Sequence, residues 1–125
     1  MKKKKILIID DDDGMRSAIR RFLAAEGKYE IDEVSDGSMV EEKIKQFSPQ
    51  LLLLDIRMPE KDGYEVCLSI RRNASLNNIK IIAMSGLAGN IGDAIIRALG
   101  ADCFFEKPFD NEKLKAKIAE LLGDE

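Results

Sequence analysis

The stretch Gln50–Asp55, QLLLLD, decides the fold class, because four consecutive leucines end on a single carboxylate. Leucine alone would also suit a helix, but the run is short and follows Pro49, which favours a strand. Continuous apolar runs of this length are typical of strands that are buried on both faces of a sheet. Four more runs read in the same way and predict further strands: Lys5–Asp10, Tyr29–Val34, Ile79–Met84 and Ala101–Phe105.

Between these runs, apolar residues recur at the spacing of one helix face. Such stripes precede or follow every predicted strand, and they include Met15/Ile19/Phe22/Leu23, Val40/Ile44/Phe47, Tyr64/Cys67/Leu68, Ile91/Ala94/Ile95/Ala98 and Leu114/Ile118/Leu121/Leu122. The alternation predicts an α/β fold, a doubly wound (βα)₅ parallel sheet with helices on both faces. With 125 residues and no linker, repeat or low-complexity segment, residues 1–125 form one predicted domain.

The predicted helices carry matching end signals. Gly27 and Gly100 stand just past helix ends, where a left-handed residue is favoured. Asp36 and Asp110 stand where a side chain would cap a helix start, and Asp12 or Asp13 would cap the first helix.

Composition excludes several classes of function. The net charge of −3, without a basic stripe, gives no indication of a nucleic-acid partner, and no apolar run is long enough to span a membrane. Two well-separated cysteines indicate a reduced, cytoplasmic protein. The chain has no histidine, which excludes Ser-His-Asp triads, histidine metal sites and phosphohistidine carriers.

Polar residues gather where the predicted strands end, which is where ligands bind in open α/β sheets. Asp10 and Asp11 follow the first strand, Asp55 ends the third, Ser85 follows the fourth and Lys107 follows the fifth. Converging carboxylates repel unless a cation joins them, and an all-oxygen ligand set suits Mg²⁺. An aspartate can also act as a nucleophile toward phosphorus, so the set predicts a phosphoryl-transfer site.

The stretches ILIIDDDDGMR, LLLLDIRMPEKDG, MSG and EKPF together resemble the signature segments of bacterial response-regulator receiver domains, the phosphoacceptor switches of two-component systems. The resemblance spans the whole chain in order. It implies the flavodoxin-like strand order 2-1-3-4-5, a cis bond between Lys107 and Pro108, and Mg²⁺ as the cofactor. It also implies a protein that catalyses only its own phosphorylation and dephosphorylation and is otherwise not an enzyme.

The resemblance assigns a role to each matching residue. Asp55 is the expected phosphoacceptor, and the expected metal ligands are Asp10, Asp11, Asp55 and the backbone carbonyl of Arg57. Lys107 is expected to bind the phosphoryl group, while Ser85 and Phe104 are the expected switch residues. Asp13 stands where the family often has proline, Ser85 replaces the commoner threonine, and Arg57 and Leu87 occupy positions that tune phosphoryl lifetime.

The same resemblance predicts the partners. A sensor histidine kinase or a histidine phosphotransfer protein supplies the phosphoryl group. The face formed by the fourth strand, fourth helix, fifth strand and fifth helix then changes and controls a downstream protein target. We expect a monomer or a phosphorylation-dependent dimer, which either acts alone or belongs to a longer regulator.

Two other interpretations share parts of this pattern. A haloacid-dehalogenase-like phosphatase also forms an aspartyl phosphate, but Gly14 follows Asp13 and no second acid stands two residues after Asp55. A flavodoxin-like binding module would use the fold without phosphorylation, yet no Ser/Thr-rich phosphate loop is present and only two tyrosines could stack on a flavin.

Overall fold

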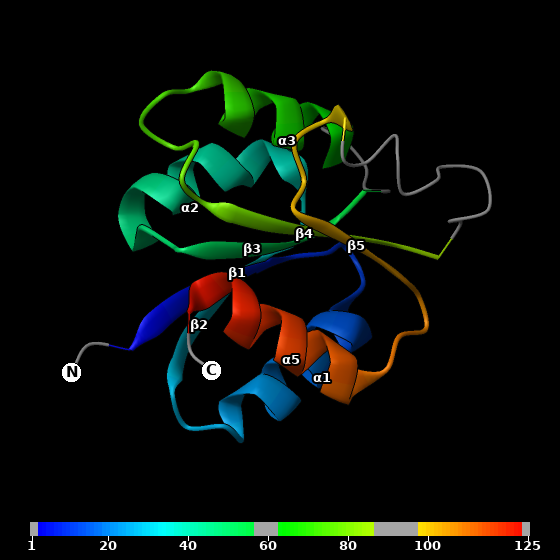
Figure 1. The fold of residues 1–125 in the computed structure, drawn as a ribbon. Helices are drawn as coiled ribbons and strands as arrows, with labels where there is room; N and C mark the ends of the chain where they lie inside the picture. The colour runs from blue at the N-terminus through cyan, green and yellow to red at the C-terminus, as the bar shows by residue number, and fades with distance from the viewer. Residues whose placement is uncertain (1–2, 57–62, 87–97, 124–125) are drawn as a thin grey trace.

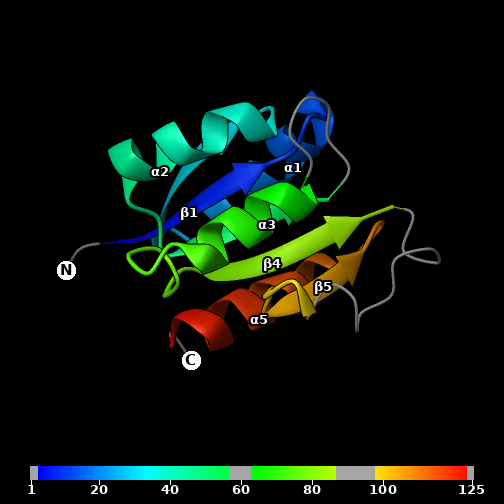
Figure 2. The same ribbon diagram turned by 90° about the horizontal axis from the view of Figure 1, so that it is seen from above.

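Five parallel strands form one sheet in the order β2-β1-β3-β4-β5, which confirms the predicted topology. The structure is a computed structural model that describes residues 3–56, 63–86 and 98–123. The strands are β1 (Lys4–Ile9), β2 (Tyr29–Val34), β3 (Leu51–Asp55), β4 (Lys80–Ser85) and β5 (Cys103–Glu106). All neighbouring strands pair in parallel, so their carboxyl ends lie at one edge, and the arrows of β1, β4 and β5 in Figure 2 point the same way.

Helices cover both faces of the sheet (Figure 1). Helices α2 (Val40–Phe47) and α3 (Gly63–Arg72) lie on one face, and α1 (Asp13–Ala24) and α5 (Asn111–Leu122) lie on the other. A short 3-10 helix, η1 (Gly37–Met39), leads into α2. Most of the predicted fourth helix, including Ile91, Ala94 and Ile95, lies outside the described residues.

Two apolar layers hold these helices to the sheet. Successive strand residues point to opposite faces, so Leu52 and Leu54 join the layer under α2 and α3, while Leu51 and Leu53 join the layer under α1 and α5. We call these the α2–α3 layer and the α1–α5 layer. All four leucines of β3 have no exposed surface, which explains why its sequence shows no polar alternation.

The helix ends follow the predicted chemistry. Asp12 caps α1 by accepting from the Met15 backbone N–H at 3.0 Å, and Asp110 caps α5. Asp36 caps η1 rather than α2 itself. Gly27 and Gly100 have φ values of 71° and 99°, as the end signals predicted.

Only β2 has both of its predicted ends, and the other four strands differ from the sequence prediction by one or two residues. The predicted ranges were Lys5–Asp10 for β1, Gln50–Asp55 for β3, Ile79–Met84 for β4 and Ala101–Phe105 for β5. Ile79 precedes β4 and Ala101 precedes β5, although both are buried. Apolar character marks burial, and a residue just before a strand can be buried without pairing in the ladder. Cys67 and Cys103 are buried free thiols.

Candidate functional site

The register of the sheet brings the predicted site residues to one edge. Ile9 of β1 pairs with Leu54 of β3, so Asp10 and Asp55, which follow them, reach the same level. Asp55 in turn pairs with Met84, the residue before Ser85. Residues that are far apart in the chain therefore converge because each follows or ends a neighbouring parallel strand.

Three carboxylates form a compact cluster at this edge. Ligand oxygens of Asp10, Asp11 and Asp55 all lie within 4.8 Å of one another. Asp10 has no exposed surface and Asp55 is 5% exposed, whereas Asp11 is exposed. Like charges this close raise the electrostatic free energy of the folded chain unless positive charge compensates them.

Lys107 supplies part of that compensation. Its Nζ donates to Asp10 Oδ2 at 2.9 Å and lies 3.6 Å from Asp55 Oδ2. Burial by itself would lower the pKa of Lys107, but the hydrogen bond to Asp10 and the charges of Asp10 and Asp55 raise its pKa overall. The side chain is therefore a cation at neutral pH. We call Asp10, Asp11, Asp55 and Lys107 the acidic site.

The acidic site fits a divalent cation. Three carboxylates and one ammonium leave a formal charge of −2, and every candidate ligand atom among the three acids is a carboxylate oxygen. Mg²⁺ takes this kind of hard oxygen set, with one or two carboxylates bound directly and waters completing its shell. The backbone carbonyl of Arg57, the fourth predicted ligand, lies outside the described residues, as does Leu87.

Ser85 and Phe104, the two predicted switch residues, lie on the neighbouring strands β4 and β5. Ser85 ends β4, is fully buried, and accepts the Lys107 backbone N–H at 2.8 Å through its carbonyl. Phe104 is half-buried on β5, pairs with the small residue Ala83, and packs against the α2–α3 layer. The bond between Lys107 and Pro108 is cis, as the resemblance implied.

A close backbone approach places the start of α3 beside Asp55. A Cβ added to Gly63 would lie 2.5 Å from Ile56 Cα and 2.6 Å from the Asp55 carbonyl oxygen. The Gly63 N–H donates to the Ile56 carbonyl at 2.9 Å. Only glycine allows this contact, a requirement that the sequence analysis did not identify.

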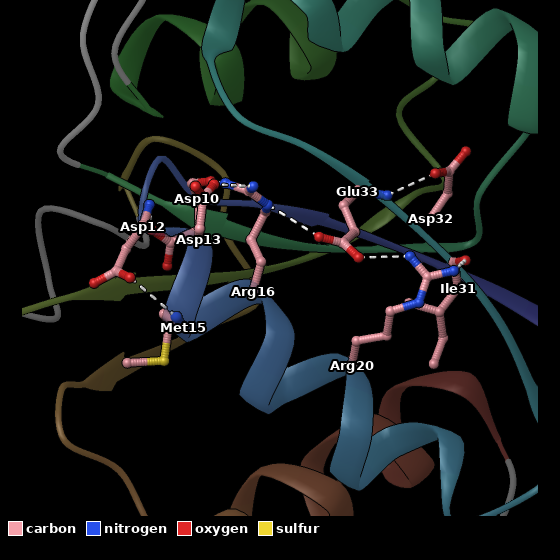
Figure 3. A network of polar contacts seen from close by, with 9 residues as sticks. All are labelled: Asp10, Asp12, Asp13, Met15, Arg16, Arg20, Ile31, Asp32 and Glu33. Carbon is pink, nitrogen blue, oxygen red and sulfur yellow. Dashed lines mark hydrogen bonds and ion pairs between the residues drawn. The ribbon is translucent and has the colours of Figure 1, made fainter.

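Sequence reasoning also missed a network of ion pairs behind residues 10–12, which join β1 to α1 and which we call the acidic loop (Figure 3). Arg16 of α1 contacts Glu33 of β2, Asp13 and the carbonyl of Asp10, and Arg20 holds Glu33 from the other side. Glu33 reads in the sequence as an ordinary strand surface charge. The available signal was an arginine one turn into a helix that starts in an acid-rich loop.

A second network lies at the opposite end of the sheet. Arg71, at the end of α3, donates to the carbonyls of Gly100, Asn77 and Ile79 at 2.6, 3.0 and 2.7 Å, and to Asp102 Oδ2 at 3.0 Å. These contacts tie α3 to the segments that lead into β4 and β5. They are remote from the acidic site and serve the fold.

Along the described stretches of the chain, no helix combines the length and the apolar character that a membrane crossing requires.

Comparison of the sequence with known proteins points to one family. Residues 6–119 match the family model described as "Response regulator receiver domain". The "Probable transcriptional regulator ycf27" of Porphyridium aerugineum is 34% identical over 122 residues, which are 98% of this chain and 49% of that protein. The chain thus spans about half the length of the curated relatives it matches.

Solved structures agree in fold. The receiver domain of the DNA-binding response regulator merR from Colwellia psychrerythraea superposes with a TM-score of 0.90 at 28% identity, over 97% of this chain and 99% of that one. The receiver domain of the sensor histidine kinase PA1611 from Pseudomonas aeruginosa, described with a magnesium ion in its active-site cleft, gives a TM-score of 0.86 at 26% identity over 97% and 98% of the two chains. With its sheet order, its acidic edge and a family match over residues 6–119, the chain belongs to the response-regulator receiver domains.

Proposed function

We propose that this chain is a phosphoacceptor switch in which Asp55 receives a phosphoryl group from a histidine of a sensor kinase or a phosphotransfer protein. The observation that carries the proposal is the acidic site itself. Asp55 ends a buried strand, lies 3.6 Å from the Lys107 ammonium, and shares a cluster whose formal charge of −2 calls for a dication. Groups of these kinds catalyse phosphoryl transfer by positioning the reactants and by neutralising charge.

In the proposed reaction, a carboxylate oxygen of Asp55 forms a bond to phosphorus as the bond from phosphorus to the donor imidazole nitrogen breaks. The leaving nitrogen keeps the electron pair and takes up a proton. The Lys107 ammonium meets an oxygen of the transferred group, and the Ser85 hydroxyl donates to another. The donor histidine must come from another protein, since this chain has none.

Mg²⁺ is the proposed cofactor, held by Asp10, Asp11 and Asp55 together with the backbone carbonyl of Arg57. When bound, the ion neutralises charge on the transferring group. Support comes from the all-oxygen cluster within 4.8 Å and from the magnesium described in the PA1611 receiver domain.

The proposed output is a change at the face built by β4, the segment between β4 and β5, β5 and α5. The covalent phosphoryl group draws Ser85 and Lys107 toward it, and Phe104 turns inward against the sheet. Phe104 pairs with Ala83, a residue with a small side chain. A downstream protein target reads this face, in a monomer or in a dimer formed on phosphorylation.

The wider role follows from the same assignment. We propose a cytoplasmic regulator that catalyses only its own phosphorylation and dephosphorylation and makes no direct contact with nucleic acid through residues 1–125. The relatives named as transcriptional regulators are about twice as long as this chain, so their DNA-binding function need not belong to the matched half. No observation on the described residues favours a haloacid-dehalogenase-like phosphatase.

Intact-mass measurement after incubation with acetyl phosphate tests the proposal. We expect the protein to gain one phosphoryl group in the presence of Mg²⁺, and to gain none when EDTA removes the metal. Asp55→Asn should abolish the gain. Glu106→Gln provides the matched control, because it removes an exposed carboxylate at the end of β5 and should leave the gain intact. A gain that persists in Asp55→Asn, or no gain in the unaltered protein, would overturn the assignment.

A further inference from the structure

Arg16 links the acidic loop to β2 and also pairs with Asp13 at the start of its own helix (Figure 3). Its Nη1 donates to the Asp10 carbonyl at 2.6 Å, its Nε donates to Glu33 Oε1 at 3.0 Å, and its Nη2 pairs with Asp13. The side chain is only 14% exposed. A guanidinium can make these contacts at once because its N–H groups form a rigid fork, which a lysine ammonium does not have.

The hydrogen bond from Arg16 to the Asp10 carbonyl adds to two others that hold Asp10 in place. The Asp10 N–H donates to the Val34 carbonyl at 3.3 Å, and its Oδ1 accepts the Asp12 N–H at 2.9 Å. Arg16 holds the remaining backbone group. Asp10 and Asp11 are adjacent, so whatever fixes the Asp10 peptide also sets the direction in which both carboxylates leave the chain.

Glu33 orients Arg16 in turn. Arg20 donates to Glu33 Oε2 at 2.5 Å and to the Ile31 carbonyl at 3.1 Å, so the glutamate is held between two arginines of α1. The glutamate also balances the charge of Arg16. Arg16 therefore adds rigidity to the acidic loop without adding an unopposed positive charge beside a cation site.

We propose that Arg16 is a positioning residue that, braced by Glu33, holds the Asp10–Asp11 loop in the geometry that binds the divalent cation. The inference rests on the proposed function, because it assigns Arg16 a role toward the same metal site. Groups that orient metal ligands without touching the metal have a large effect on affinity in other proteins.

The proposal makes a prediction whose sign differs from that of simple electrostatics. Arg16→Met removes a positive charge near three carboxylates, which by Coulomb's law alone would tighten Mg²⁺ binding. Loss of positioning would instead weaken it, and we expect the dissociation constant for Mg²⁺ to rise roughly tenfold. Arg16→Lys keeps the charge but loses the fork, so it should also bind Mg²⁺ more weakly than the unaltered protein.

Titration calorimetry with Mg²⁺ on the full chain would measure these constants. Arg21→Met is the matched control, since Arg21 is exposed on the same helix and the substitution changes charge and size equally. It should leave the constant unchanged or lower it slightly. Far-UV circular dichroism and urea unfolding would establish that each variant is folded at the titration temperature.

A second measurement needs no metal. In EDTA, amide hydrogen exchange at Asp12, whose N–H donates to Asp10 Oδ1, should become faster in Arg16→Met while amides of α5 keep their rates. A merely structural role for Arg16 would lower protection across the fold instead, and that result would overturn the inference.

The outcomes separate this inference from the proposed function. If the unaltered protein binds Mg²⁺ and Arg16→Met binds it as tightly or more tightly, only the role of Arg16 is refuted. If the unaltered protein binds no Mg²⁺, the metal assignment itself falls and this inference falls with it. Weaker binding in both Arg16 variants, with Arg21→Met unaffected, supports it.

Discussion

Replacing Asp55 by asparagine should make the metal-free protein more stable, although Asp55 is the proposed phosphoacceptor. The substitution keeps the size of the side chain and removes one charge from the acidic site. It relieves the repulsion of Asp55 by Asp10 and Asp11, whose ligand oxygens lie at most 4.8 Å away, and it gives up the attraction of Lys107 at 3.6 Å.

The distances give the size of the effect. At an effective dielectric constant of about 20, each carboxylate pair at 4.8 Å costs about 3.5 kcal/mol and the lysine attraction at 3.6 Å contributes about 4.6 kcal/mol. The substitution then raises the free energy of unfolding by about 2 kcal/mol if both carboxylate pairs repel at full strength. The rise is about 0.6 kcal/mol if solvent halves the repulsion between Asp55 and the exposed Asp11. Asp55 is 5% exposed, and removing a buried charge also avoids its desolvation cost. We therefore expect a gain of about 1 to 2 kcal/mol.

Urea unfolding followed by far-UV circular dichroism would measure this difference, since the chain has no tryptophan to serve as a fluorescent probe. In EDTA, Asp55→Asn should have the larger free energy of unfolding. In Mg²⁺ the advantage should shrink or reverse, because a ligand that binds only the folded state stabilises it and the variant has lost one carboxylate. Glu30→Gln, an equal charge change at an exposed position of β2, should have little effect in either buffer.

The reasoning would be refuted if Asp55→Asn were less stable than the unaltered protein in EDTA. It would also be refuted if Mg²⁺ stabilised both proteins equally. The first result would mean that Lys107 already neutralises the cluster, and the second would mean that Asp55 is no metal ligand.

Three further substitutions test other parts of the structure. Gly63→Ala should lower the free energy of unfolding by about 2 to 3 kcal/mol, because its Cβ would lie 2.5 Å from the Ile56 backbone. The hydrogen bond from Arg20 lowers the pKa of Glu33; burial opposes this shift and a second hydrogen bond, from Arg16, reinforces it. The ionised Glu33 therefore stabilises the fold above its unfolded-state pKa, and this stabilisation is lost as the pH falls toward the lowered folded-state pKa. Glu33→Gln should make the free energy of unfolding less dependent on pH in the acid range. Arg71→Lys should lower stability by roughly 2 kcal/mol in urea unfolding, because a lysine cannot reach all of the acceptors that Arg71 serves.

Each of these changes has a matched control. Ser17→Ala on exposed α1 surface controls for Gly63→Ala, Glu30→Gln for Glu33→Gln, and Arg72→Lys on exposed α3 surface for Arg71→Lys. If a variant and its control changed the free energy of unfolding equally, the role assigned to the corresponding contact would be wrong.

Sequence patterns predicted the sheet because burial on both faces makes its inner strands, β1, β3 and β4, visible as apolar runs. The Leu51–Leu54 run and the acids that end two strands were sufficient to place Asp10 and Asp55 together, since parallel strands share a carboxyl edge. The cap at Asp12 was predictable because it depends on neighbours along the chain.

Contacts between distant segments could not be predicted in the same way. Arg16 meets Glu33 only because the register of β1 and β2 places Glu33 beside the acidic loop. Gly63 is needed only because the start of α3 touches the end of β3. Both depend on side-chain reach and backbone approach in three dimensions, and no local pattern records either of them.

The sheet divides the apolar interior into two separate compartments, the α2–α3 layer and the α1–α5 layer. Neighbouring residues of one strand, such as Leu52 and Leu53, face different compartments, so a change of shape in one is not passed directly to the packing of the other. Each compartment can therefore accept substitutions independently of the other, while the positions of the strand ends are retained. Such independence is consistent with a backbone that superposes at a TM-score of 0.90 on a receiver domain sharing only 28% of its residues.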